Sequence, residues 1–95
     1  MNLRVNLYDI LVNDRLLVRV YDLDNEGREG KIKIYVSGSE SPIEVDIDHL
    51  SLSPIDIFID GTPVTGMIHE VTAKIFAGTE DSLHDTDTRM IMMGR

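Results

Sequence analysis

Residues 31–48 read KIKIYVSGSESPIEVDID, two alternating stretches on either side of a polar loop. In both stretches every second residue is Ile or Val, and most residues between them are charged. A period of two is typical of β-strands with one buried face. Pairing Val36 with Ile43 sets two lysines opposite two aspartates, Lys33 with Asp46 and Lys31 with Asp48. Because opposite charges across strands stabilise an antiparallel pair, the stretch predicts a hairpin.

Residues 2–23 predict another hairpin. Two alternating stretches flank Asn13-Asp14, residues that tolerate positive φ and suit a two-residue turn. Such a turn pairs residue i with residue 27 − i, which sets Leu7 opposite Val20. The same register gathers the apolar residues of both stretches on one face, and a one-residue slip would separate them.

The second half of the chain holds three further strand signals. Residues 55–60 alternate and end in Asp60-Gly61, a strong hairpin signal. The returning arm, residues 62–64, contains a proline and is predicted to be short or at an edge. Residues 67–77 are predicted as a strand because they are rich in β-branched side chains, and a helix over about 64–77 is the alternative. Residues 79–88 are polar and are predicted as a loop before a last strand at Met90–Met93.

Composition supports a mainly β fold. The chain has eleven Ile and eight Val but only two Ala, and Ile and Val suit strands whereas Ala favours helices. We therefore expect a single domain over residues 1–95, a compact antiparallel sandwich or open barrel of six to seven short strands built from consecutive hairpins. A helix at 64–77 would make the fold α+β instead.

Nearly all of the net charge of −8 lies in residues 34–73, which carry seven carboxylates and no lysine or arginine. Three of these carboxylates form an outward acidic face at every second position, namely Glu44, Asp46 and Asp48. Their spacing of about 6.6–6.8 Å is close to that of phosphates, so an acidic mimic of nucleic acid is one alternative function. Lys31 and Lys33 would neutralise two of the three. Direct nucleic-acid binding is not expected, because its affinity comes from clustered cations.

No catalytic signature is present. The chain lacks cysteine, a Gly-x-Ser-x-Gly turn and glycine-rich phosphate motifs, so no enzymatic activity, cofactor or metal is expected. Residues 22–27 resemble the start of a calcium loop, but Lys33 occupies the position of its bidentate glutamate. A small metal-dependent hydrolase, using His84 with Asp85 and Asp87 or His49 with Asp48, is an alternative.

The outer face of the first hairpin carries the candidate contact residues. The 27 − i pairing sets Tyr8 opposite Arg19, Ile10 opposite Leu17, and Asn6 opposite Tyr21, all on the side away from the core. Tyr and Arg are enriched at interfaces, and a monomer seldom leaves such a patch exposed. The alternative is that another segment of the same chain covers these residues.

We therefore expect a non-catalytic binding module that self-associates as a homo-oligomer or docks on a larger protein partner, with the acidic segment steering a basic partner. An oligomeric small-ligand binder is a further alternative. The chain shows no apolar signal-peptide core and no apolar run of ~20 residues, so a cytoplasmic protein without membrane contact is expected. By analogy alone, the small size would suit an accessory protein of a virus or mobile element.

Overall fold

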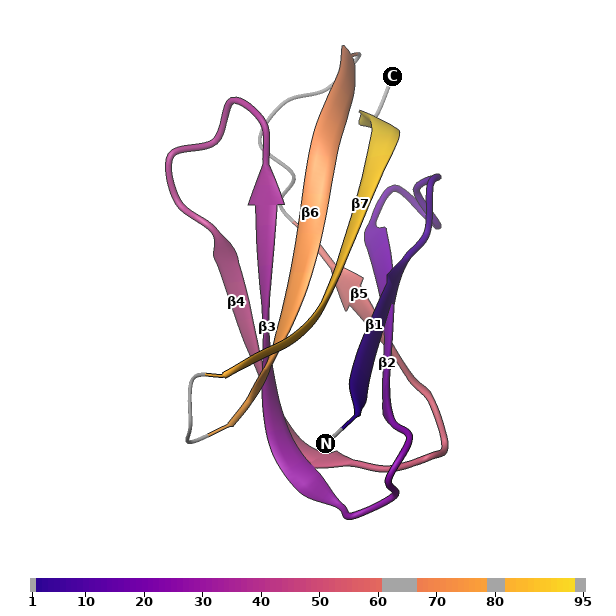
Figure 1. Cartoon of the computed structure of the whole chain (residues 1–95). Coiled ribbons are helices and arrows are strands. Elements are labelled where there is room, and N and C mark those ends of the chain that lie inside the picture. The colour runs from indigo at the N-terminus through magenta and orange to yellow at the C-terminus, as the bar shows by residue number, and fades with distance from the viewer. Residues whose placement is uncertain (1, 61–66, 79–81, 94–95) are drawn as a thin grey trace.

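A computed structural model describes residues 2–60, 67–78 and 82–93 as an antiparallel β-sandwich (Figure 1). The seven strands are β1 (Leu3–Leu7), β2 (Leu16–Asp22), β3 (Arg28–Val36), β4 (Ile43–Leu50), β5 (Ile55–Ile59), β6 (Met67–Ala77) and β7 (Leu83–Met93). The three-stranded sheet has the order β1-β2-β5, and the four-stranded sheet has the order β4-β3-β6-β7. The described residues contain no helix, so the predicted β-sandwich is confirmed and the helical alternative over 67–77 is wrong.

Among the described residues, the hydrophobic core between the sheets consists of aliphatic side chains. Alternate residues of the strands face inward, so β1 buries Leu3, Val5 and Leu7, and β6 buries Val71, Ala73 and Ile75. Both alanines of the chain belong to this core, whereas no aromatic side chain does. The large number of Ile and Val residues therefore fills the interior of both sheets, as β-branched residues on a pleated surface do.

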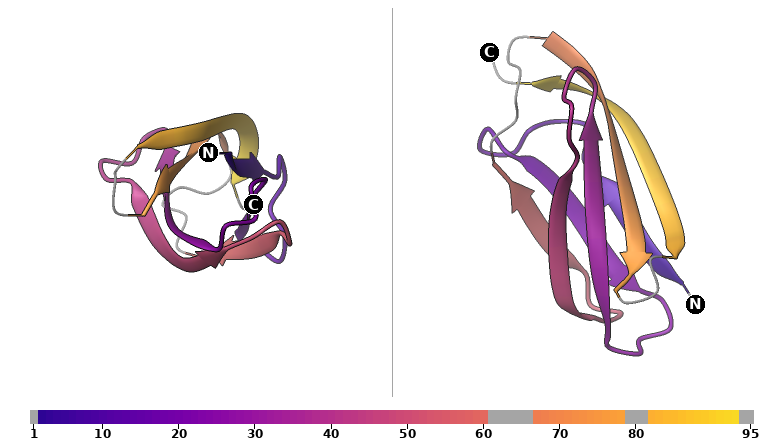
Figure 2. Two further views of the ribbon diagram at one scale, coloured as in Figure 1. Left: turned by 60° about the horizontal axis from the view of Figure 1, so that its bottom comes forward. Right: turned by 90° about the vertical axis from the view of Figure 1, so that its left-hand side faces the viewer.

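The two sheets meet at the neighbouring edges of β1 and β7, which the end-on view in Figure 2 shows side by side. There, side-chain carboxylates take the place of a backbone ladder: the Val5 N–H donates to Asp85 Oδ2 at 3.1 Å, and the Leu7 N–H to Asp87 Oδ2 at 2.7 Å. The predicted loop at 79–88 is therefore wrong for residues 83–88, which belong to β7. Their inward side chains are polar because they bind backbone amides, a pattern that hydropathy does not detect.

The first hairpin has the predicted turn but a different register. Asn13 and Asp14 have φ values of 52° and 61°, and Val12 bridges to Arg15 as the 27 − i rule requires. Further from the turn the ladder shifts by two, because residues 8–11 lie opposite only residues 16–17. Leu7 therefore pairs with Val18 rather than Val20. A shift of two preserves the faces, so the inward and outward sets are as predicted.

The hairpin at 31–48 is also shifted by two. Lys31 pairs with Asp46 and Lys33 with Glu44, instead of the predicted Asp48 and Asp46. The reason is that β4 begins opposite Ile34, while Tyr35 and Val36 pair with β6 alone. Lysines still face carboxylates on the outer side, so the charge pattern predicted the faces but could not distinguish two registers that both oppose unlike charges.

The remaining predictions concern the second half of the chain. Residues 67–77 form the predicted strand, and Met90–Met93 belongs to the last strand, β7. Residues 55–59 form β5, which pairs with β2. The predicted hairpin at Asp60-Gly61 and its arm at 62–64 fall almost wholly outside the described residues.

Candidate functional site

The outer surface of the three-stranded sheet gathers aromatic and charged side chains. We call it the three-stranded face and define it by six residues from β2, β5 and the segment after β1: Tyr8, Leu17, Arg19, Tyr21, Asp56 and Phe58. Strand alternation places them there, since their neighbours Val18, Val20 and Ile57 point toward the core. Residues distant in sequence thus form one continuous surface.

An apolar row crosses the middle of this face. Leu17 pairs with Phe58 across β2 and β5, and on the other side the Tyr8 N–H donates to the Leu17 carbonyl at 3.1 Å. Leu17 is only 5% exposed although it points away from the core, whereas Phe58 is 43% exposed. The centre of the face is therefore densely packed and its two ends present aromatic rings.

An arginine side chain lies over each of these rings. Arg19 forms two hydrogen bonds to the Asp56 carboxylate, Nε to Oδ1 at 2.8 Å and Nη2 to Oδ2 at 3.2 Å. Its guanidinium lies 5.8 Å from the centre of the Tyr8 ring, and that of Arg15 lies 5.3 Å from the centre of the Phe58 ring. The hydrogen bond from Arg19, together with its charge, lowers the pKa of Asp56 despite some desolvation. Aspartate and arginine therefore remain charged and orient each other.

The predicted contact residues are partly brought together. Tyr8 and Arg19 touch despite the shifted register, while Tyr21 pairs with Arg4 instead of Asn6. Ile10 lies in the irregular segment between β1 and the turn and is 64% exposed, and it does not pair with Leu17. Leu17 itself is buried within the chain. Whether the surface binds a partner stays a prediction.

Sequence reasoning missed Phe58, Asp56 and Arg15. Alternation in residues 55–60 already places Asp56 and Phe58 on one side of a strand. However, β5 follows β4 along the chain and pairs with β2 in the other sheet. No local signal identifies that neighbour, because the contact depends on how the two sheets stack.

The predicted acidic face is partly neutralised. Lys31 Nζ lies 3.7 Å from Glu44 Oε1 and 3.9 Å from Asp46 Oδ1. Asp48 lies next to an irregularity of the β3–β4 ladder and lines a polar depression with a cavity volume of about 290 Å³. Three acidic residues, one lysine and three uncharged residues line this depression: Glu29, Asp46, Asp48, Lys31, Gly30, Ile47 and Gly78.

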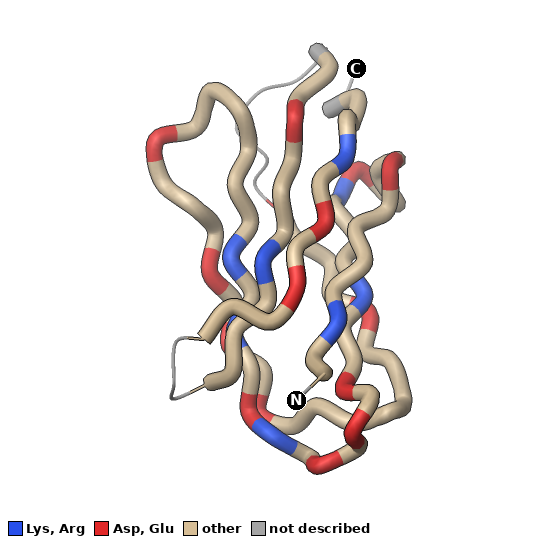
Figure 3. The backbone as a smooth tube through the Cα atoms, viewed as in Figure 1, with Lys and Arg blue, Asp and Glu red and all other residues tan. Residues whose placement is uncertain are grey.

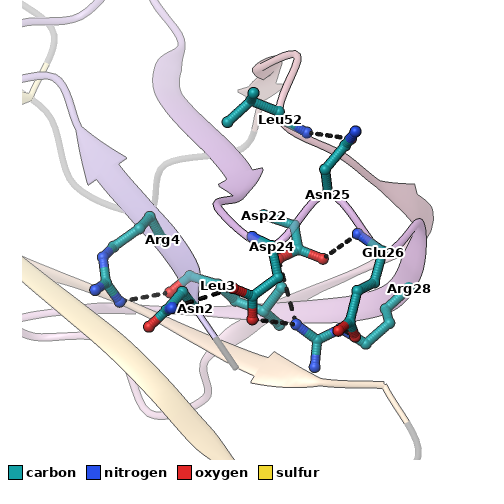
Figure 4. Close-up of polar contacts among 9 residues, drawn as sticks. All are labelled: Asn2, Leu3, Arg4, Asp22, Asp24, Asn25, Glu26, Arg28 and Leu52. Carbon is teal, nitrogen blue, oxygen red and sulfur yellow. Dashed lines mark hydrogen bonds and ion pairs between the residues drawn. The ribbon is translucent and has the colours of Figure 1, made fainter.

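The stretch that resembles a calcium loop is a turn organised by Asp22 (Figure 4). The Asp22 carboxylate is fully buried and accepts hydrogen bonds from the backbone N–H groups of Asp24 at 2.9 Å and Glu26 at 3.2 Å. Arg28 Nη2 donates to the same carboxylate at 3.3 Å. Burial by itself raises the pKa of Asp22, but these hydrogen bonds and the charge of Arg28 outweigh it and lower the pKa. The carboxylate is thus occupied by groups of its own chain.

Neither of the two sequence clusters considered for a metal, His84 with Asp85 and Asp87 or His49 with Asp48, forms a metal site in the structure. Across the described ranges, no group of three or more His, Asp or Glu side chains is placed to hold a metal ion. Asp85 and Asp87 accept backbone hydrogen bonds from β1, and the His49 ring lies against Gly27. These carboxylates therefore have a structural role at the junction of the sheets.

Comparison with known proteins finds no matching family model, and neither a curated protein nor a solved structure matches the chain. In the part of the chain that the structure describes, no helix is long and apolar enough to span a bilayer.

Proposed function

We propose that this chain is a non-catalytic binding module that contacts a protein partner through the three-stranded face. The observation that carries the proposal is the distribution of aromatic residues. All three Tyr and both Phe lie outside the buried hydrophobic core, whose described members are Leu, Ile, Val and Ala. Aromatic side chains are the largest source of apolar burial, and a chain that keeps them outside retains that surface for a contact.

The arrangement of the face supports a contact of this kind. Tyr and Arg are the residue types most enriched among the side chains that dominate binding energy. Here Arg19 is already fixed by Asp56 and by the Tyr8 ring, so its side chain loses little conformational freedom when a partner binds. A pre-organised arginine beside the half-buried Tyr8 ring, on the same face as the exposed Phe58 ring, favours a specific contact over non-specific adhesion.

The charge of the chain favours a basic partner. The excess of eight negative charges attracts cationic surfaces and repels anionic ones. On β4, Asp46 is 81% exposed and contributes to this field. Long-range attraction of this type accelerates association and weakens as ionic strength rises.

The test is a quantitative pull-down from native lysate, with the wild-type chain and a Tyr8→Ser/Phe58→Ser variant each immobilised. We expect the variant to retain the partner at least tenfold less, because two aromatic anchors that each contribute about 2 kcal/mol are removed. A Met90→Ser/Met92→Ser variant is the control, since it also replaces two large apolar side chains by serine and these two are exposed on the other sheet. Thermal unfolding confirms that all three proteins are folded.

Two results would contradict the proposal. One is capture of the same proteins, in equal amounts, by the wild type and the Tyr8→Ser/Phe58→Ser variant. The other is loss of capture in the Met90→Ser/Met92→Ser control alone, which would move the contact to the four-stranded sheet.

A further inference from the structure

The three lysines of the chain lie together on the outer surface of the four-stranded sheet. Lys31 and Lys33 are on β3, and Lys74 is directly opposite Lys33 on β6. On the other side of β3, Glu44 and Asp46 of β4 are their cross-strand neighbours. Figure 3 shows these acidic and basic positions on adjacent strands. An acidic column (Glu44, Asp46) thus runs beside a basic column (Lys31, Lys33).

The ion pairs within the chain neutralise the carboxylates of the acidic column only weakly. Lys31 contacts the acidic column at 3.7 and 3.9 Å, and the Glu44 and Asp46 side chains are 51% and 81% exposed. Ion pairs that are this exposed contribute at most ~1 kcal/mol and exchange partners easily. The acidic column is therefore available to a lysine of another molecule.

Lys33 and Lys74 contact carboxylates less than Lys31 does. Within residues 2–60, 67–78 and 82–93 neither lysine forms an ion pair; their ammonium groups lie 5.1 Å from the ring centres of Phe76 and Tyr35. Like charges directly opposite each other destabilise a sheet. In a chain with a net charge of −8, two facing lysines leave positive charge where a carboxylate from outside would be stabilising.

We propose that this face binds a second copy of the same chain. Acidic and basic columns side by side are self-complementary about a two-fold axis that runs between β3 and β4, parallel to the strands. Such an axis sets Glu44 and Asp46 of each copy against Lys33 and Lys31 of the other. The contact is isologous, so it closes at two copies, and the rings of Tyr35 and Phe76 lie on the same face.

Charge selects this orientation over others. Two copies that each carry a net charge of −8 repel one another through most of their surfaces. Facing unlike columns is attractive, and other orientations juxtapose carboxylates. The surface is separate from the three-stranded face, so self-association here and partner binding there do not depend on each other.

The test measures the oligomeric state by sedimentation and light scattering in buffer of low ionic strength. The wild type is expected to form dimers that dissociate in ~1 M NaCl, where the Debye length falls to ~3 Å. Lys33→Glu and Glu44→Lys are each expected to raise the dimer dissociation constant at least tenfold, because each places like charges across the axis. An equimolar mixture of the two variants should form dimers again, since the contacts between positions 33 and 44 across the axis then each join a lysine to a glutamate.

Controls separate this contact from other effects. Arg4→Glu and Asp9→Lys make the same charge changes away from this face, and both should leave dimerisation intact. Because Lys33 and Glu44 also face each other within one chain, circular dichroism must show that the single variants are folded. Should either fail to fold, Lys33→Gln and Glu44→Gln replace them, and each should weaken the dimer.

Three results would overturn the inference: a wild type that is monomeric at its highest soluble concentration, single variants that dimerise as the wild type does, or a mixture that stays monomeric. Loss of the dimer in Tyr8→Ser/Phe58→Ser would also overturn it, because the copies would then meet through the three-stranded face. A failed dimer test leaves partner capture by that face unaffected, so the two proposals fail separately.

Discussion

An Asp22→Ala variant is expected to lose about 3 kcal/mol of unfolding free energy. The buried carboxylate accepts hydrogen bonds from two backbone N–H groups of the turn and from Arg28. Removing it leaves those backbone donors without their acceptor in a partly buried turn between the two sheets. Urea denaturation at neutral pH measures the loss, and Asp24→Ala, at a more exposed position in the same turn, should cost less than ~1 kcal/mol.

The effect of Asp22 should depend on pH in a defined direction. Its pKa in the folded protein is lowered below the ordinary value of about 3.9. The stability that the carboxylate contributes is therefore fully present above that ordinary value and is lost as the pH falls through the lowered native value. The difference between wild type and Asp22→Ala should stay constant from neutral pH to about 5 and shrink below 4. A difference that grows on acidification would contradict the assignment.

An Asp87→Ala variant is expected to lose about 2 kcal/mol, because its carboxylate accepts the Leu7 N–H at 2.7 Å. This bond joins the edges of the two sheets, so the effect should be local as well as global. Amide hydrogen exchange should accelerate at Leu7, whose partner is lost, and much less at Val20 in the centre of the three-stranded sheet.

The neighbouring residue provides the matched control for Asp87. Thr86 is exposed on the outer side of β7, so Thr86→Ala should change stability by less than ~0.5 kcal/mol. Equal losses for Asp87→Ala and Thr86→Ala would show that the strand's propensity, rather than the hydrogen bond to β1, carries the effect.

Local patterns predicted most of the strands but not their partners. Alternation identified the strands at 31–36 and 43–48, β-branched residues identified the strand at 67–77, and the turn residues Asn13 and Asp14 have the expected positive φ. Both predicted registers were wrong by two residues, because a period of two cannot distinguish ladders shifted by an even number. Residues 83–88 were missed since Asp85 and Asp87 face inward to bind backbone amides rather than to be buried as apolar groups.

The candidate site was predicted in the same partial way. Tyr8, Arg19 and Tyr21 could be placed on the outer side of one hairpin from alternation alone. Phe58 and Asp56 could not be added, because β5 reaches β2 only after the chain has crossed to the other sheet and returned. Strand pairings of that kind depend on the whole fold, so a short stretch of sequence does not predict them.

The aliphatic interior determines what optical spectroscopy can observe in this protein. Without tryptophan, and with every tyrosine on an outer face, intrinsic fluorescence and near-ultraviolet dichroism are insensitive to the packing between the sheets. The same signals respond directly to events at the surface. Tyr8 and Tyr21 lie on one side of the sandwich and Tyr35 on the other, so replacing Tyr35 by phenylalanine would leave tyrosine fluorescence that reports on one side alone.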